Sequence, residues 1–258
     1  MRSGKALIGI LLALNASAQL RVASLNVDKK SGPKFIGSLS RQADLRRADI
    51  LLLQEVVDSP RFHVAAEAAN ALGMRFAFAP AFRLRGDMDE GLAILSRYPL
   101  ESRTVIPLAR NRLHFRNRIR IALAVTARTP LGPVRVIDIH LDNRINSDLK
   151  LAQLGGIWPE VERSAAPVIV GGDFNTGNFY WASHVVPVPG EQKQREDVLD
   201  AMREHGFRTT LGSGPATYHI PGQKLDWIFV RGLEPGASGV TPIRFSDHNS
   251  VWMAVAPR

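Results

Sequence analysis

The sequence contains no cysteine among its 258 residues. A chain without thiols has no disulfide bonds, no thiolate zinc site and no cysteine nucleophile. Aromatic residues are also scarce, at 7% of the chain, which argues against an extensive surface for stacking nucleobases. Acidic residues number 24 against 33 lysines and arginines, so the formal net charge is +9. This excess of positive charge favours polyanionic partners without identifying one.

The chain also lacks an apolar run of the roughly 20 residues that a helix needs to cross a bilayer. The apolar run over residues 6–14 follows two basic residues and precedes the small residues 16–18, which is the pattern of a secretory signal peptide. We therefore predict a cleaved signal peptide over residues 1–18. The mature chain, residues 19–258, is expected to have no integral membrane span and to be secreted or periplasmic.

Short apolar runs alternate with helical patterns along the mature chain. Seven runs rich in Val, Ile and Leu have the length and boundaries of buried strands. They cover residues 20–26, 50–55, 91–96, 134–140, 168–173, 225–230 and 249–255. Helical patterns cover residues 62–72, 146–163 and 196–205. This alternation predicts a single α/β domain.

Residues 110–125 alternate apolar and basic side chains, which predicts a strand with a row of arginines on one face. Such a face is either solvated or in contact with phosphate, because arginine matches phosphate oxygens. We favour the solvated face for Arg110, Arg112 and Arg116. For Arg118 and Arg120 both interpretations stay open, and these two are our candidate substrate-binding residues.

Polar residues gather at the ends of the predicted strands. They are Asn26 and Asp28, Glu55, His140 and Asp142, Asp173 and Asn175, Asp226, and Asp247 with His248. Ligands of α/β sheets bind at strand ends, where rigid strands hold the loop residues. Turn formation or helix capping explains one such residue, and we expect capping for Asp142, but it explains the whole set poorly.

The residue types in this set indicate metal-assisted hydrolysis. Carboxylate and amide oxygens suit a hard divalent cation, Mg²⁺ or Mn²⁺. His140 and His248 can exchange protons near neutral pH, and Asp226 is a candidate to orient one of them. A metal, a carboxylate beside the attacking water and cationic groups are the components of phosphoryl transfer to water.

The order of these motifs resembles that of the endonuclease/exonuclease/phosphatase superfamily. This superfamily includes pancreatic-type deoxyribonucleases, abasic-site endonucleases, neutral sphingomyelinases and inositol-polyphosphate phosphatases. The resemblance extends over residues 22–255 and includes Gln54-Glu55, Gly172-Asp173-Phe174-Asn175, Leu225-Asp226-Trp227 and Ser246-Asp247-His248. It implies two packed mixed β-sheets flanked by helices, a four-layer α/β sandwich, with the site at one rim.

The resemblance also implies roles for single residues. Glu55 matches the principal metal ligand, and Asn26 and Asp247 match residues that help to hold the metal. Asp173 matches the aspartate that orients or deprotonates the attacking water, and Asn175 matches the amide that positions it.

Three further matches concern the phosphate. His248 matches the histidine that contacts the scissile phosphate, with Asp226 as its carboxylate partner. His140 matches a histidine that assists the leaving oxygen. Arg120 resembles a basic residue found on that strand in many members.

The substrate stays open. Residues 178–190 form an apolar, aromatic segment that could stack a base, cover a small organic phosphate, enter a membrane interface or simply pack on the domain. We predict an exported, monomeric metal-dependent phosphodiesterase, with DNA or RNA among its candidate substrates. A phospholipase C-type or phosphomonoester hydrolase is the alternative, and an inactive phosphate-binding module is a third hypothesis.

Overall fold

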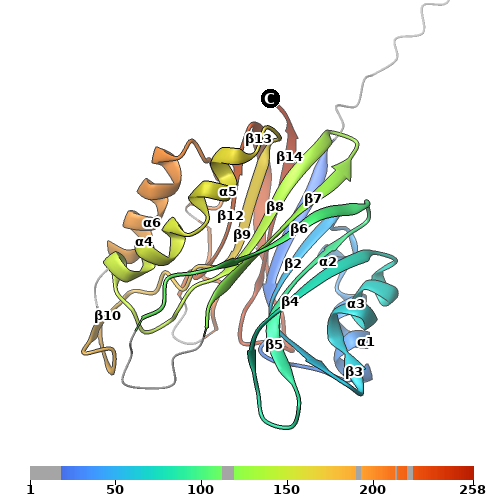
Figure 1. Ribbon diagram of the computed structural model, residues 1–258, viewed down its shortest axis with the longest axis horizontal. Helices are drawn as coiled ribbons and strands as arrows, with labels where there is room; N and C mark the ends of the chain where they lie inside the picture. Colours follow the sequence, from blue (N-terminus) through green and yellow to red (C-terminus); the bar gives the residue numbers. More distant parts are fainter. Residues whose placement is uncertain (1–18, 112–118, 190–192, 213, 220–222) are drawn as a thin grey trace, which may run out of the picture.

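Two β-sheets pack face to face at the centre of the computed structural model, which describes residues 19–111, 119–189, 193–212, 214–219 and 223–258 (Figure 1). The first sheet has the strand order β13-β14-β1-β2-β5-β4, with β3 paired to β2. Its strands are β1 (Leu20–Asn26), β2 (Ile50–Ser59), β3 (Phe62–His63), β4 (Arg75–Arg83), β5 (Asp89–Ser96), β13 (Leu233–Thr241) and β14 (Ser250–Pro257). The second sheet has the order β12-β9-β8-β7-β6. Its strands are β6 (Leu100–Pro107), β7 (Ile121–Thr129), β8 (Gly132–His140), β9 (Val168–Asp173) and β12 (Asp226–Arg231).

Helices cover the outer face of each sheet (Figure 1). The first sheet carries α1 (Pro33–Arg41), α2 (Ala43–Arg46) and α3 (Val64–Leu72), and the second carries α4 (Ser147–Gly155), α5 (Trp158–Arg163) and α6 (Lys193–Glu204). Each sheet contains a parallel pair, β1 with β2 and β8 with β9, among antiparallel ones. The predicted α/β sandwich of two mixed sheets flanked by helices is therefore confirmed.

The central strands are apolar on both faces because both faces are covered. Val22 and Leu52 belong to the core between the sheets, whereas their neighbours Ala23 and Leu51 pack with residues of α1 and α3. A buried hydrogen bond joins the two sheets, in which Gln54 Nε2 of β2 donates to Asp138 Oδ1 of β8 at 2.6 Å. Burial raises the pKa of Asp138 well above its usual value, and the hydrogen bond from Gln54 opposes this shift.

Each of the seven predicted apolar runs lies in a strand to within one residue, and three of the strands that the sequence did not predict are at sheet edges. β4, β6 and β13 each end a sheet, where one side of the strand lacks a neighbour. Edge strands are less completely covered, so they carry exposed and polar residues instead of a continuous apolar run.

Two helix predictions needed correction. The predicted helix over 62–72 begins at Val64, because Phe62 and His63 pair with β2, and it ends at Gly73, whose φ of 65° is left-handed. The predicted helix over 146–163 is interrupted near Gly156 and becomes α4 and α5. The helix predicted over 196–205 is α6. Within the described part of the chain, no helix has the length and apolar character required to traverse a bilayer.

Of the strand predicted over 110–125, the structure describes residues 110–111 and 119–125, and only residues 121–125 lie in a strand. Strand β7 begins only at Ile121, and its first five residues are all buried, so no solvated face exists there. Arg110 is exposed and precedes the strand. Arg112, Arg116 and Arg118 lie outside the described residues.

Candidate active site

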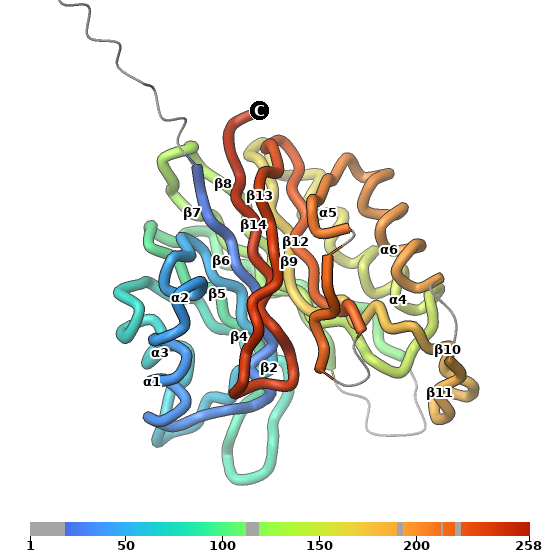
Figure 2. Tube along the Cα trace, turned by 180° about the vertical axis from the view of Figure 1, so that it is seen from behind, coloured from blue at the N-terminus to red at the C-terminus, as the bar shows by residue number. Residues whose placement is uncertain are grey.

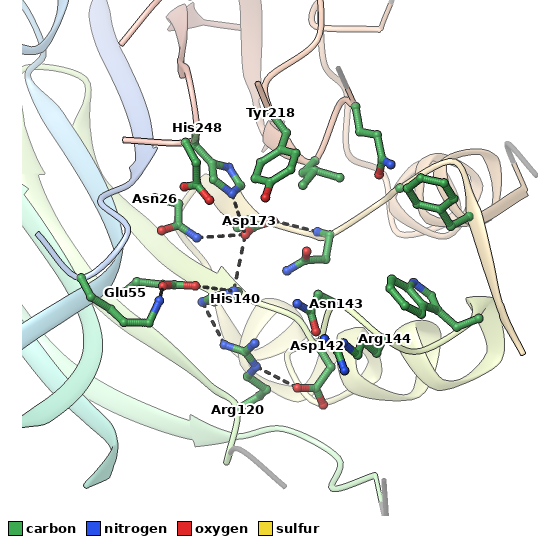
Figure 3. Close-up of a pocket in the computed structure, with 18 residues that line it drawn as sticks. Asn26, Glu55, Arg120, His140, Asp142, Asn143, Arg144, Asp173, Tyr218 and His248 are labelled. Atoms are coloured by element: carbon green, nitrogen blue, oxygen red, sulfur yellow. Dashed lines mark hydrogen bonds and ion pairs between the residues drawn. The ribbon is translucent and has the colours of Figure 1, made fainter. Parts of the chain in front are cut away.

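Polar side chains from several strand ends meet in one pocket of about 640 Å³ (Figure 3). Adjacent strands are in register there, so that His140 at the end of β8 pairs with Asp173 of β9, and Asp173 pairs with Asp226 of β12. Eight predicted site residues line the pocket, namely Asn26, Glu55, Arg120, His140, Asp173, Asn175, Asp247 and His248. Asp226 is fully buried behind His248, and Arg118 lies outside the described residues.

Strained backbone presents two of these side chains. Glu55 has a left-handed φ of 55° at a register shift of β2 against β5, between Leu53 and Val56. Asn175 has a φ of 50°. Left-handed conformations cost free energy in residues other than glycine and cluster at functional sites. Gly172 lets β9 approach β8, because a Cβ atom there would lie 2.0 Å from the carbonyl oxygen of Ile139.

Asp173 is the buried centre of the site. Its carboxylate accepts hydrogen bonds from Asn26 Nδ2 at 3.1 Å and from the backbone N–H of Asn175 at 2.9 Å. The Nε2 atoms of His140 and His248 lie 3.4 and 3.8 Å from Asp173 Oδ2. Burial raises the pKa of Asp173 to about 6 against the attraction of His248. The group is therefore mostly ionised at pH 7, yet it can take up a proton near neutrality.

His248 is held by a carboxylate. Its Nδ1 lies 2.8 Å from Asp226 Oδ2, and the backbone N–H of His248 donates to Ser246 Oγ at 3.1 Å. Burial alone would favour the neutral ring, but Asp226 and Asp173 outweigh it and raise the pKa of His248 to about 9. His248 is therefore a cation at neutral pH, with Nδ1–H donating to Asp226.

His140 is held by a guanidinium. Its Nδ1 lies 3.0 Å from Arg120 Nη1, and a guanidinium has only donors, so this Nδ1 must accept. The ring proton of His140 is then on Nε2, which faces Asp173. Arg120 is buried and donates from Nε to Asp142 Oδ1 at 2.9 Å. It belongs to the pocket, so the solvated-face interpretation of Arg120 is wrong.

Asp142 anchors this arginine and does not cap a helix. Gln153 donates to its Oδ2 at 2.8 Å and accepts its backbone N–H at 3.0 Å, while Lys150 donates to its carbonyl oxygen at 2.7 Å. The N-cap position of α4 is Asn146. The capping prediction failed because Asp142 lies about one helical turn before Asn146 in the sequence and its carboxylate is already paired with Arg120 and Gln153.

The pocket also contains three side chains whose oxygen atoms could bind a metal ion. Glu55, Asn26 and Asp247 all line the pocket, and the ammonium group of Lys29 contacts the Glu55 carboxylate. Asn26 Oδ1 also accepts the backbone N–H of Asp28, whose own carboxylate pairs with Lys30 at 2.9 Å. Asp28 is not among the residues that line the pocket.

A second group of possible ligands, Asp173, Asp226 and His248, has ligand atoms within 4.8 Å of one another. A histidine must be neutral to bind a metal. In this group His248 Nδ1 is already paired with Asp226 Oδ2, so the contacts present suit proton exchange.

The other end of the pocket is more apolar and was only partly foreseen. Phe179, Trp181 and Leu225 line it together with Asn143, Arg144 and Gln223, whereas Tyr218 lies beside His248, with ring centroids 5.0 Å apart. Phe179 and Trp181 come from the hairpin of β10 (Phe179–Ala182) and β11 (Val186–Pro189), which stands at the edge of the molecule away from both sheets (Figure 2). The aromatic residues within 178–190 had indicated that this segment could contact the substrate. No pattern in the sequence indicated that Lys29, Asn143 or Arg144 would belong to the site.

Comparisons with known proteins agree with the fold. A model described as Endonuclease/Exonuclease/phosphatase family matches residues 20–248. The structure is similar to an endonuclease/exonuclease/phosphatase from Beutenbergia cavernae, with a TM-score of 0.71 and 19% identity over 93% of this chain and 72% of that one. It is similar to the human Nocturnin catalytic domain with bound sulfate, with a TM-score of 0.68 and 19% identity over 93% and 94% of the two chains. For truncated TDP2 from Caenorhabditis elegans the TM-score is 0.60, with 17% identity over 92% and 97%.

Proposed function

The chain belongs to the endonuclease/exonuclease/phosphatase family, and from this premise we propose that it is a metal-dependent phosphodiesterase in which water attacks the phosphorus. Membership suggests a hydrolase of phosphate esters, a class that includes nucleases. The observation that carries the proposal is the buried carboxylate of Asp173 flanked by the Nε2 atoms of His140 and His248. This arrangement places one proton acceptor between two proton donors, facing a pocket that also contains Arg120.

We assign the metal to Asn26, Glu55 and Asp247. All three line the pocket, and Mg²⁺ and Mn²⁺ prefer carboxylate and amide oxygens as ligands. The contact of the Lys29 ammonium with Glu55 supports the assignment, because it shows that this carboxylate attracts a cation. A divalent ion bound there would neutralise negative charge on the phosphate oxygens.

We assign the orientation of the attacking water, and the acceptance of its proton, to Asp173. Asn175 fixes this carboxylate, because its backbone N–H donates to Asp173 and its side-chain Nδ2 donates to the Leu141 carbonyl at 2.9 Å. Protonated His248 donates from Nε2 to a phosphate oxygen and adds positive charge. His140 donates its Nε2–H to the leaving oxygen.

A nucleic acid is the first candidate substrate. The net charge of +9 favours a polyanion, and the family acts on phosphate esters such as nucleic acids. The similar human Nocturnin domain holds a sulfate, a tetrahedral anion of the same shape as phosphate. These observations favour DNA or RNA over a neutral substrate.

A phospholipid is the second candidate, and one observation favours it. Six large apolar side chains are exposed among the described residues, and four of them, Tyr180, Val185, Val186 and Val188, belong to the β10–β11 hairpin. An apolar hairpin tip beside a hydrolytic pocket fits insertion into a lipid interface.

A substrate panel tests the proposal. Purified protein is incubated with Mg²⁺ or Mn²⁺ and with plasmid DNA, RNA, sphingomyelin, inositol phosphates and a chromogenic phosphodiester. Turnover of a diester that stops with a chelator is expected. Release of phosphate from monoesters alone contradicts the proposal, and absence of all turnover by folded protein supports an inactive phosphate-binding module.

We also propose that the protein is exported and monomeric. Residues 1–18 have the signal-peptide pattern, and the domain assigned to residues 19–258 contains the whole site. Expression of the full chain in a bacterium should yield a mature N-terminus at Gln19 outside the cytoplasm. Light scattering should then give the mass of one chain, and a dimer mass contradicts the monomer.

A further inference from the structure

The β10–β11 hairpin has one face toward the pocket and the other toward solvent. Phe179 pairs with Pro189 and Trp181 pairs with Pro187, and successive side chains of a strand alternate between its faces. Phe179 and Trp181 line the pocket, whereas Tyr180 between them is 46% exposed. The hairpin therefore adds an aromatic wall to the pocket, separate from its exposed apolar face.

Two side-chain amides fix this wall. Asn146 accepts the backbone N–H of Trp181 at 2.8 Å and donates to the carbonyl oxygen of Trp181 at 3.2 Å. Gln194, which is buried in α6, donates to the carbonyl oxygen of Phe179 at 2.7 Å. The rings of Phe179 and Trp181 meet edge to face with centroids 6.3 Å apart. A wall fixed before the ligand arrives loses little conformational entropy on binding.

Polar groups accompany the aromatic wall. The guanidinium of Arg144 lies 5.7 Å from the centre of the Trp181 ring. The side-chain amide of Gln223 packs against Gly177, and both residues line the pocket. A Cβ atom at position 177 would lie only 2.3 Å from Gln223 Oε1. Figure 3 shows Asn143 and Arg144 on the far side of Asp173 from Glu55. This end of the pocket thus combines a ring face with hydrogen-bonding groups, away from the proposed metal ligands.

We propose that Trp181, Phe179, Arg144 and Gln223, which we call the hairpin subsite, bind the base of a nucleotide unit joined to the scissile phosphate. The inference rests on the proposed phosphodiesterase function and names its substrate class. A base presents a flat π-face to Trp181 and a polar edge to Gln223 and Arg144. An acyl chain would offer no hydrogen-bond partner to the amide of Gln223 where that amide lines the pocket, which is costly. The subsite therefore favours a nucleotide over a lipid.

The test compares two diesters that share the p-nitrophenyl leaving group. One is the p-nitrophenyl ester of thymidine 5′-monophosphate, and the other is methyl p-nitrophenyl phosphate, in which a methyl group replaces the nucleoside. Trp181→Ala should lower kcat/KM for the nucleotide ester at least about 10-fold, the size expected of one stacked base, mainly through KM. The same variant should leave the methyl ester unchanged, and Trp181→Phe should retain most of the preference for the nucleotide ester.

Tyr180→Ala is the matched control, because Tyr180 is the neighbour of Trp181 on the opposite face of the hairpin. It should leave kcat/KM for both esters unchanged. Thermal unfolding checks that each variant is folded, and Gln223→Leu provides a second variant that should affect only the nucleotide ester.

The outcomes separate this inference from the proposed function. If wild-type protein hydrolyses the methyl ester but Trp181→Ala affects both esters equally or neither, the hairpin subsite is wrong and the phosphodiesterase stands. If wild-type protein hydrolyses neither ester and no diester of the substrate panel, the proposed function is wrong. The subsite is then judged by binding of thymidine 5′-monophosphate to the protein, which Trp181→Ala must weaken. Loss of sphingomyelin turnover in Tyr180→Ala, with Trp181→Ala unaffected, would overturn the subsite in favour of a lipid.

Discussion

His248 and His140 lie on either side of Asp173 and are held by partners of opposite charge. His248 Nδ1 donates to the carboxylate of Asp226 at 2.8 Å, whereas His140 Nδ1 accepts from the guanidinium of Arg120 at 3.0 Å. The first partner stabilises the imidazolium, and the second requires a lone pair on the ring. The pocket therefore contains one cationic histidine and one neutral histidine, and both present Nε2 to Asp173. The partner of Nδ1, rather than the histidine itself, determines what each ring contributes.

Replacing each histidine by glutamine should separate these contributions most strongly. Glutamine can donate a hydrogen bond but carries no charge and exchanges no proton. His248→Gln should lower kcat by roughly 10²–10³-fold, the usual cost of removing a donor that stabilises negative charge in the transition state. His140→Gln keeps a neutral N–H donor and should cost about 10-fold or less, the value of one hydrogen bond. Steady-state kinetics on a chromogenic diester provide the measurement, and equal losses in both variants contradict the distinction.

The second largest effect is expected on the free energy of unfolding, when Arg120, the partner of His140, is replaced. Arg120 and Asp142 form a buried ion pair with side-chain exposures of 6% and 11%. Arg120→Met leaves the carboxylate of Asp142 buried without its cation, and we expect a loss of about 3–5 kcal/mol in the free energy of unfolding. Denaturant unfolding measures this loss.

The double variant Arg120→Met with Asp142→Asn is the control, because it removes the stranded charge as well. It should be more stable than Arg120→Met alone. If the two variants are equally stable, the pair does not act as a unit and Arg120 is held by other contacts.

The two histidines also show what the sequence could and could not predict. His248 and Asp226 come from short motifs at strand ends, and their roles as partners follow from the resemblance and agree with the contact in the structure. The partner of His140 was not predicted. Arg120 lies directly before β7, and its alternation with apolar neighbours left open whether it faces solvent or phosphate, without indicating a contact with His140.

The same limit applies to the fold. Central strands were predicted because both of their faces are buried, which leaves a continuous apolar run in the sequence. Contacts between distant loops leave no such trace. Asp142 follows His140 by two residues, yet its role depends on Gln153 of α4 and on Arg120, and neither position is set by local sequence.

Asp226→Asn should lower the pKa of His248. In the folded protein this pKa is about 9, above the ordinary 6.5, because of the neighbouring carboxylates. The raised value means that the pair contributes stability below about pH 6.5 and that this contribution is lost as the pH rises through about 9. Without the Asp226 charge, His248 should release its proton at a lower pH. NMR titration of the imidazole in metal-free protein measures the shift.

Asp58→Asn is the matched control for this titration. Asp58 pairs with His63 on the surface at 2.9 Å, so the same substitution is made beside an exposed histidine. It should leave the titration of His248 unchanged. An unaltered midpoint for His248 in Asp226→Asn would mean that Asp173, and not Asp226, sustains the imidazolium.

Lys29 and Glu55 form a second pair of a cation and a carboxylate at this pocket. This pair is more exposed to solvent than the pair of His248 and Asp226. The Lys29 side chain is 34% exposed, whereas that of Asp226 is 0% exposed, so the ammonium group can leave its carboxylate at little cost. We expect Lys29 to compete with a divalent cation for Glu55. Lys29→Met should strengthen Mn²⁺ binding by a factor of about two to five, the value of an exposed ion pair. Lys30→Met, which removes a lysine paired with Asp28 instead, should leave the affinity unchanged. Calorimetric titration measures both, and weaker Mn²⁺ binding by Lys29→Met would mean that the ammonium group orders Glu55 for the metal instead of competing with it.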